Sequence, residues 1–254
     1  MNGQPLKSVT HTDDRTRRLS PQRPSYLRIV DTGSTEARIT VGDARLRRAL
    51  NVAVALLGIL LTFPLWVIIA IVIKLTSRGP VIHSQIRVGL DSRSTGSGQN
   101  DPRRRHDIGG RPFTMYKFRT MQVAAEKQSG AVWATANDPR VTPAGKILRQ
   151  YRLDELPQLI NVLKGDMNIV GPRPERPTIF ASLSESVPNY RLRQRARPGI
   201  TGLAQIRQQY DSCLDDVKRK VEFDLEYIRE PSFWRDLKIM LETIPVILLR
   251  RGGW

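Results

Sequence analysis

The stretch from Ala49 to Ile73, ALNVAVALLGILLTFPLWVIIAIVI, runs for 25 residues without a charged side chain. Asn51 and Thr62 are its clearly polar residues. About 20 consecutive apolar residues are enough for a helix to cross the hydrocarbon core of a bilayer. A buried helix of a soluble protein rarely runs this far without a charge, so the stretch predicts a membrane segment. Its late start, its length and the lack of a small-residue cleavage site argue against a signal peptide.

Basic residues flank this segment on both sides: Arg45, Arg47 and Arg48 before it, Lys74 and Arg78 after it. Because Lys and Arg favour the cytoplasmic side of a membrane, both ends are expected there. Pro64, near the middle, lacks a backbone donor and favours a kink. The sequence therefore favours a re-entrant helix–break–helix over residues 45–78. A spanning helix that tolerates its proline is the alternative.

The composition narrows the class of protein further. The chain has 254 residues, enough for one sizeable core, and 41 basic against 24 acidic side chains give a net charge of +17. Such a charge favours an anionic partner, which could be a nucleic acid, an anionic lipid surface or a phosphate-rich substrate. Hydrophobic residues make up 40%, which excludes both a polytopic membrane protein and a fully disordered chain. The single cysteine, Cys213, excludes an intramolecular disulfide.

Three further segments have a distinct composition. Residues 1–44 are expected to form a flexible basic tail, and residues 91–111 a flexible Arg-rich loop that either touches anionic headgroups or only aids solubility. Residues 233–251 mix aromatic, aliphatic and basic side chains. This pattern favours an amphipathic helix at a membrane interface over a terminal core helix. The remaining sequence, within residues 79–254, is expected to hold the chemistry.

A short strand is predicted over Phe113–Met121. Strict alternation along it would put Lys117 and Arg119 on one face, and two cations on one face suit a phosphate. An ordinary solvated strand face is the alternative. Farther along, Thr142 and Pro143 predict a helix start, with the helix running to about Arg152.

A second helix is predicted to open at Asp154-Glu155-Leu156-Pro157 and to end at Gly165. Its two acidic residues could be only a cap and a first-turn charge, which stabilise a helix by roughly 0.5–2 kcal/mol. The surrounding basic residues favour a different interpretation: Arg149, Arg152, Arg173, Arg176 and Arg197. Prolines stiffen the loop 171–177, and a guanidinium fork binds phosphate oxygens through two hydrogen bonds. Together these residues suggest phosphoryl chemistry with a divalent ion.

The sequence resembles the bacterial sugar transferases, the monotopic phosphoglycosyl transferases, from about Arg45 to its C-terminus. The segments that carry the resemblance are Tyr116–Met121 (YKFRTM), Asp138–Thr142 (DPRVT), Leu153–Gln158 (LDELPQ), Asn161–Asp166 (NVLKGD), Val170–Pro174 (VGPRP) and Arg197–Gly202 (RPGITG). Each motif is weak alone, but the ordered set is specific. Leu203 departs from the family pattern, which usually has tryptophan there, and Phe63 stands where a serine often precedes the helix-breaking proline.

The resemblance implies a helix-rich α/β fold. The small catalytic domain would lie on the cytoplasmic face of the bacterial inner membrane, anchored by a re-entrant helix and by interfacial amphipathic helices. The implied activity is transfer of a sugar 1-phosphate from a UDP-sugar to a polyprenyl phosphate of the undecaprenyl type, with release of UMP and a requirement for Mg²⁺. This step would begin the synthesis of an exopolysaccharide, capsule, O-antigen or glycoconjugate.

Residue by residue, Asp154 matches the family nucleophile and Glu155 its partner, and both are expected to bind the metal. The expected path runs through an aspartyl-phosphosugar intermediate. The phosphate- or substrate-binding candidates are Lys117, Arg119, Arg149, Arg173, Arg176, Arg197 and Gln205, and Pro64 matches the helix break. The expected partners are the UDP-sugar, the polyprenyl phosphate and membrane lipids, without nucleic acid, and a homodimer is left open. A non-catalytic membrane scaffold and a tethered nucleic-acid binder are the competing interpretations.

Overall fold

The computed structural model describes residues 41–91, 109–123, 138–208 and 213–249, all within one compact unit, Glu36–Trp254. Most of the expected tail 1–44 and most of the expected loop 91–111 lie outside these residues. The elements in chain order are α1 (Val41–Thr76), β1 (Ile82–Val88), β2 (Pro112–Phe118), α2 (Pro143–Gln150), η3 (Leu153–Glu155), α3 (Gln158–Lys164), β3 (Asn168–Val170), α4 (Pro177–Ser186), η4 (Tyr190–Arg195), β4 (Gly199–Thr201), α5 (Leu203–Arg207), α6 (Leu214–Arg229) and α7 (Phe233–Leu248), where η marks a 3₁₀ helix. The described part is therefore a helix-rich α/β fold.

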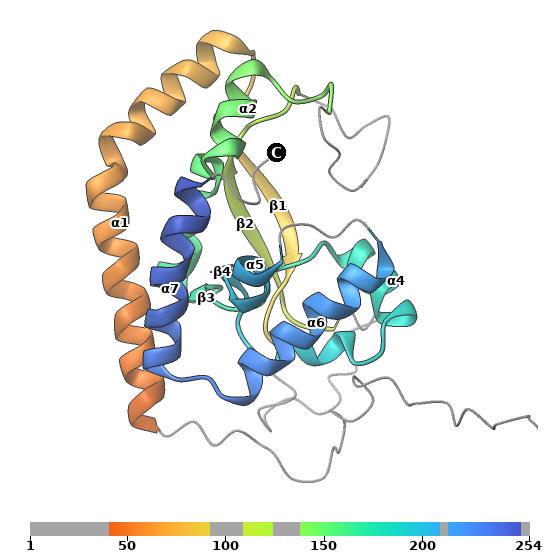
Figure 1. Ribbon diagram of the computed structural model, residues 1–254. Helices are drawn as coiled ribbons and strands as arrows, with labels where there is room; N and C mark the ends of the chain where they lie inside the picture. The colour runs from red at the N-terminus through yellow and green to blue at the C-terminus, as the bar shows by residue number, and fades with distance from the viewer. Residues whose placement is uncertain (1–40, 92–108, 124–137, 209–212, 250–254) are drawn as a thin grey trace, which may run out of the picture. The chain divides into compact units, whose positions relative to one another are not determined.

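Helix α1 contains the apolar segment and is long and apolar enough from Asp43 to Thr76 to cross a membrane. Most of its apolar side chains are exposed, unlike those of a core helix in a soluble protein. The predicted break is a bend inside one continuous helix, because the backbone stays helical through Pro64. Figure 1 shows the C-terminal part of α1 inclined relative to its N-terminal part. Proline removes one hydrogen bond from a helix, which favours a bend of this kind.

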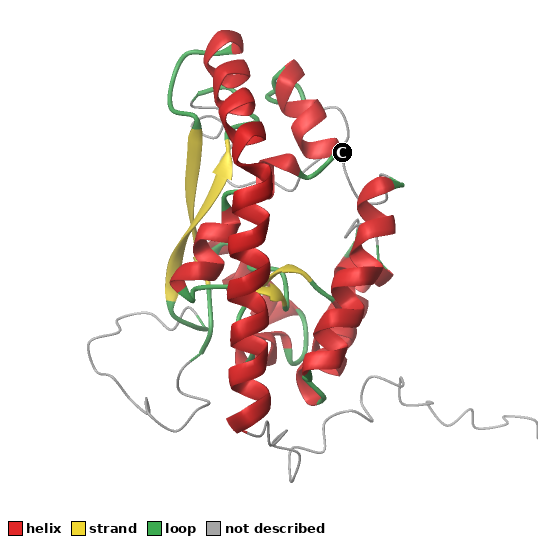
Figure 2. Ribbon diagram, turned by 90° about the vertical axis from the view of Figure 1, so that its left-hand side faces the viewer, coloured by secondary structure: helices red, strands yellow, loops and turns green. Residues whose placement is uncertain are grey.

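The strands form two small sheets. β1 and β2 pair antiparallel, with His83 opposite Lys117 and Arg87 opposite Phe113. β3 and β4 pair parallel, with Asn168 beside Gly199. Seen from the side of α1, the β1–β2 hairpin lies on one side of this helix and α7 on the other (Figure 2).

Helix α1 packs into the unit along much of its length. Near its N-terminal end, Ala55 is fully buried in a cluster that includes Val162, Val170 and Tyr227. Near its C-terminal end, Ile69 and Ile73 pack with Phe118 and Leu148 in a second cluster. The helix is therefore part of the hydrophobic core on one face and exposed on the other.

Helix α2 starts as predicted. Thr142 accepts a hydrogen bond from the Gly145 N–H, and Pro143 occupies the first turn. The second predicted helix begins later than expected, because residues 153–155 form a 3₁₀ turn and the α-helix starts at Gln158. Pro157 has no N–H to donate to the carbonyl of Leu153, which instead accepts from the Leu156 N–H at 3.3 Å. Gly165 ends α3 with φ +83°, as predicted.

Candidate functional site

The acidic pair lies in the short η3 turn between α2 and α3. Arg152, just before it, adopts φ +55°, a left-handed conformation that is uncommon for a residue other than glycine. This residue turns the chain sharply after α2. Asp154 and Glu155 are both buried, with 7% and 6% of their surface exposed.

Among the described residues, three cations surround Glu155. Arg173 donates from Nη2 to Oε1 at 2.6 Å and from Nη1 to Oε2 at 3.3 Å. Lys117 Nζ lies 3.1 Å from Oε1, and Arg152 Nη1 lies 3.6 Å from the same atom. Burial by itself would raise the pKa of Glu155, but the charges of Arg173 and Lys117 outweigh it and hold that pKa well below its usual value. Glu155 is therefore ionised and fixes these cations in place.

Asp154 is compensated less well than its neighbour. Among the described residues, Lys117 is its ion-pair partner, with Nζ 3.8 Å from Oδ2. Burial raises the pKa of Asp154, although the charges of Lys117, Arg149 and Arg173 oppose this effect. A buried carboxylate with weak compensation is a stronger nucleophile and base than a solvated one. The arrangement therefore favours Asp154 as the reactive group of the pair.

Arg173 lies in the loop after β3, and the backbone of this loop accepts hydrogen bonds from Arg193 and Arg87. The carbonyl of Arg173 accepts from Arg193 Nη2 at 3.0 Å, and Arg193 is itself paired with Asp224 at 2.7 Å. The next carbonyl, of Pro174, accepts from Arg87 Nη1 at 3.0 Å. These hydrogen bonds and the prolines of the loop restrain the backbone that carries the Arg173 guanidinium.

Arg87, Glu175 and Lys220 belong to this region, although sequence reasoning did not select them. Glu175 lies 3.0 Å from Lys220 Nζ and 3.9 Å from Arg87 Nη1. Burial lowers the pKa of Arg87 to about 10, with Glu175 opposing and the charges of Arg173 and Arg176 adding to the effect. Alternation along β1 could have selected Arg87 only with the strand register known. That register puts Arg87 on the same face of the hairpin as Lys117.

The other predicted contacts are spread more widely. Arg149 donates to Thr120 Oγ1 at 2.9 Å and acts electrostatically on Asp154. Arg176 precedes α4, Arg197 is exposed, and Gln205 donates to the Ile200 carbonyl at 2.9 Å. The structure therefore brings Lys117, Arg149 and Arg173 to the acidic pair.

Arg119, predicted to share a strand face with Lys117, lies one residue beyond β2, and its backbone N–H donates to the Val81 carbonyl at 2.9 Å. Its Nη2 donates to the carbonyl and to Oγ of Ser77, both at 2.8 Å. Arg119 therefore holds the residue that follows α1, and this contact gives it a structural role.

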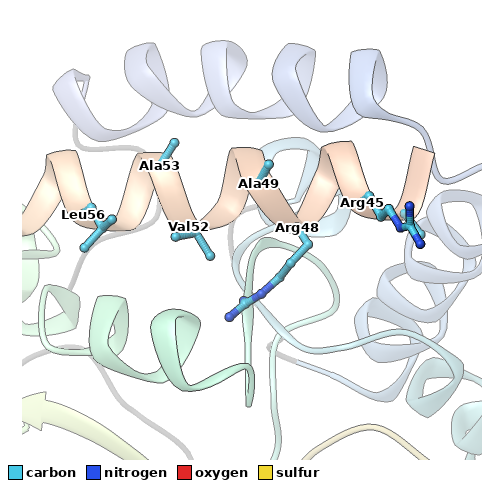
Figure 3. Close-up of a pocket in the computed structure, with 7 residues that line it drawn as sticks. Arg45, Arg48, Ala49, Val52, Ala53 and Leu56 are labelled. Atoms are coloured by element: carbon cyan, nitrogen blue, oxygen red, sulfur yellow. The ribbon is translucent and has the colours of Figure 1, made fainter. Parts of the chain in front are cut away.

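An open pocket of 790 Å³ lies on α1 and not at the acidic pair. Its lining consists of Ala44, Arg45, Arg48, Ala49, Val52, Ala53 and Leu56. Arg48 points from α1 towards α3 (Figure 3) and donates to the carbonyls of Val162 and Leu163 at 2.7 and 2.9 Å. This pocket is therefore an open groove on α1, beside the point where Arg48 joins this helix to α3.

Comparison with known proteins identifies the relatives of the chain. The model of the family described as "Bacterial sugar transferase" matches residues 42–250. The chain is 41% identical over 210 residues to a UDP-N-acetylgalactosamine-undecaprenyl-phosphate N-acetylgalactosaminephosphotransferase from Aeromonas hydrophila, with 83% of this chain and 45% of the relative covered. It is 44% identical over 202 residues to a UDP-glucose:undecaprenyl-phosphate glucose-1-phosphate transferase from Escherichia coli (strain K12), with 78% and 39% covered.

A protein with the same name from Caulobacter vibrioides is 40% identical over 204 residues, with 80% of this chain and 69% of the relative covered. The chain therefore spans less than half the length of the first two relatives and about two thirds of the third.

Proposed function

The chain belongs to the bacterial sugar transferase family, and from this premise we propose that it transfers a sugar 1-phosphate from a UDP-sugar to undecaprenyl phosphate or a similar polyprenyl phosphate, releasing UMP. The names of its relatives support both substrate classes. These relatives differ in their sugar, glucose in one and N-acetylgalactosamine in another. The proposal therefore stops at the class of UDP-hexoses and their N-acetyl derivatives. The lipid-linked product would begin the assembly of a bacterial polysaccharide or glycoconjugate.

The observation that carries this proposal is the fork between Arg173 and Glu155 beside the less compensated Asp154. Within the described part of the chain, cations outnumber carboxylates here, since Lys117, Arg149 and Arg152 also lie around the pair. Attack of a carboxylate on a diphosphate meets like-charge repulsion, which fixed cations offset. The excess positive charge suits the two phosphates of the donor.

We propose a double displacement at the sugar-bearing phosphorus. An Oδ atom of Asp154 forms a bond to this phosphorus, and the bond to the bridging oxygen breaks with its electron pair leaving on UMP. An oxygen of the polyprenyl phosphate then attacks the same phosphorus and releases Asp154 as a carboxylate. Throughout, Lys117 and Arg173 hold phosphate oxygens, while Glu155 keeps both cations oriented.

The acidic pair also fits the magnesium ion that the family implies. Mg²⁺ retains several waters and is commonly held by one or two carboxylates together with substrate phosphates. Asp154 and Glu155 would hold it, with Asp154 the more available because both oxygens of Glu155 already accept from Arg173. When bound, the ion would neutralise charge on the diphosphate of the donor.

We further propose that α1 is a re-entrant anchor that keeps both ends on the cytoplasmic face of the inner membrane. Its exposed apolar face and its basic flanks support this arrangement. Helix α7 would lie at the interface, because its exposed residues include Trp234, Leu241, Ile244 and Leu248.

A UMP-release assay tests the proposed function. Purified protein in nanodiscs with undecaprenyl phosphate and Mg²⁺ is incubated with a panel of UDP-sugars, and UMP and glycolipid are both quantified. One donor should yield UMP and lipid-linked sugar in equal amounts, and Asp154→Asn should yield neither. The absence of UMP with every donor, while a relative of known activity turns over in the same nanodiscs, would favour a scaffold role.

A further inference from the structure

Asn51 is a buried amide within the apolar segment of α1, with 1% of its surface exposed. A polar side chain in such a helix is unfavourable unless both its donor and its acceptor are satisfied. Its Nδ2 donates to the Arg47 carbonyl at 2.7 Å. Its Oδ1 accepts from the Ile169 N–H of β3 at 2.5 Å. One amide of the membrane helix therefore bonds directly to a strand of the catalytic unit.

The place that Asn51 occupies is an edge of the small β3–β4 sheet. The N–H of Asn168 donates towards β4, to the carbonyl of Pro198 at 2.8 Å. Alternation makes the N–H of Ile169 point the other way, where a third strand would pair. The amide of Asn51 takes the position of that missing strand.

A second link ties the same strand to the base of α1. The hydroxyl oxygen of Tyr227 lies 2.7 Å from Asp236 Oδ1 and 3.3 Å from the carbonyl oxygen of Val170, so its single proton is shared between these two acceptors. Arg47 completes the group, with Nε 2.8 Å from Asp236 and Nη2 donating to Tyr227 at 2.7 Å. Two consecutive residues of β3 are therefore positioned by α1, one directly and one through this group.

The segment between β3 and Arg173 is short and tightly packed. Arg173 follows Val170 by three residues, and Gly171 lies between them against the β4 side of the sheet. A Cβ atom at Gly171 would lie 2.3 Å from the carbonyl oxygen of Arg197, so no side chain fits here and the two backbone segments are in close contact. Pro172, the next residue, has a restricted φ angle. A displacement of β3 would therefore move Arg173.

We propose that Asn51 is a positioning residue for the sugar-phosphate transfer. Through its hydrogen bond to Ile169, it sets β3 and thereby the guanidinium of Arg173 against Glu155. The position of α1 relative to β3 is in this way coupled to the position of Arg173 at the proposed phosphate site. The inference rests on the proposed function, and it adds a residue of the membrane helix that does not itself touch substrate.

The test is a double-mutant cycle in nanodiscs, with kcat/KM for the UDP-sugar as the readout. Asn51→Ala should lower kcat/KM by about tenfold or more, since small misplacements of catalytic groups have effects of this size. In an Arg173→Lys background, Asn51→Ala should lower kcat/KM by less than about threefold, because the effects of residues that act through one another are not additive. Thr62→Val is the matched control on the same helix, and it should stay near wild type in both backgrounds. Equal losses from Asn51→Ala in the two backgrounds would overturn the proposal.

A second readout needs no turnover and separates this inference from the proposed function. Hydrogen exchange should rise in peptides covering residues 168–175 of Asn51→Ala, and it should stay unchanged in α2 and throughout Thr62→Val. Asn51→Asp, which keeps an acceptor for the Ile169 N–H, should exchange more slowly in this segment than Asn51→Ala. Unchanged exchange at 168–175 in Asn51→Ala would overturn the positioning role even if the enzyme is active. Absence of UMP release in the wild type would instead count against the proposed function alone.

Discussion

Arg173 donates to both carboxylate oxygens of Glu155, while Asp154, the adjacent residue, has Lys117 at 3.8 Å as its ion-pair partner among the described residues. The environment moves the two pKa values in opposite directions, raising that of Asp154 through burial and lowering that of Glu155 through the surrounding cations. Two neighbouring carboxyl groups with diverging pKa values can divide their roles. Glu155 organises the cations, and Asp154 is the group left to react.

Asp154→Asn should abolish both turnover and formation of a covalent intermediate. Wild-type protein given a competent UDP-sugar and Mg²⁺ without lipid acceptor should gain the mass of one sugar phosphate, because the second displacement cannot occur. Intact-protein mass spectrometry under single-turnover conditions measures this gain. An unmodified wild-type protein, together with sequential kinetics, would reassign Asp154 to metal binding and leave the lipid phosphate to attack directly.

Glu155→Gln is the companion variant, and it should reduce turnover strongly because Lys117 and Arg173 lose the charge that orients them. Melting temperatures of both variants are needed as controls, since each replaces a buried carboxylate. A loss of activity at an unchanged melting temperature identifies a chemical role.

Arg173→Lys keeps the positive charge but loses the planar fork that binds two oxygens at once. Hydrogen bonds to charged groups contribute about 1.5–3 kcal/mol each, so loss of one from the transition state should lower kcat/KM by roughly 10- to 100-fold. Steady-state UMP release measures the effect. Arg235→Lys is the matched control, because Arg235 forms an ion pair with the exposed Glu226 at 2.7 Å, where little stability is at stake. Near-wild-type turnover in Arg173→Lys would show that any cation suffices there.

Glu175 should make the stability of the protein depend on acidic pH. Burial alone would raise its pKa, but Lys220, Arg193 and Arg87 lower it to about 2 from a usual value of 4.5. A lowered pKa stabilises the folded state fully above about pH 4.5, and this contribution is lost as the pH falls towards 2. Glu175→Gln should therefore destabilise the protein at pH 7 by ~3 kcal/mol, and less at pH 3.5. Thermal or denaturant unfolding at several pH values measures this difference, and a constant difference across the range would contradict the prediction.

Single cysteines at Thr40 and Pro80, in a Cys213→Ser background, should both resist a membrane-impermeant thiol reagent in intact cells and react after permeabilisation. Both positions flank α1, and a re-entrant helix keeps both flanks in the cytoplasm. Gly79 is unsuitable, because its φ is +121° and an added Cβ would lie 2.2 Å from Arg119 Nη1.

Pro64→Ala should straighten the helix and expose one flank in part of the population. Labelling of only one flank in the protein that retains Pro64 would show that α1 spans the membrane.

Much of the fold follows from local sequence signals. Thr142 and Pro143 start α2, and Gly165 ends α3, because caps and helix ends depend on residues a few positions apart. The start of α3 was predicted wrongly at Asp154. Pro157 deprives this segment of a helical hydrogen bond, and the 3₁₀ turn that results outweighs the capping signal.

In the candidate site, too, some residues could be predicted from local sequence and others could not. The motifs around Asp154 and Arg173 could be recognised directly in the sequence, because each is a short contiguous segment. The contact of Arg119 with Ser77 could not be predicted from strand alternation, because these residues are 42 positions apart in the chain. Arg87 was missed, because its face is defined only by pairing with a strand that lies beyond residues 91–111.

The sequence by itself determined the long apolar segment, the start of α2 and the end of α3, and the order of the family motifs. These depend on composition and on neighbours within a few residues. The tertiary structure decided which cations meet Glu155, how Asp154 is left less compensated, and that Asn51 bonds to β3. The contacts of Arg173 and Lys117 with Glu155, and of Asn51 with Ile169, join residues 18, 38 and 118 positions apart in the chain. Their geometry depends on how several elements pack together, and no local pattern in the sequence specifies it.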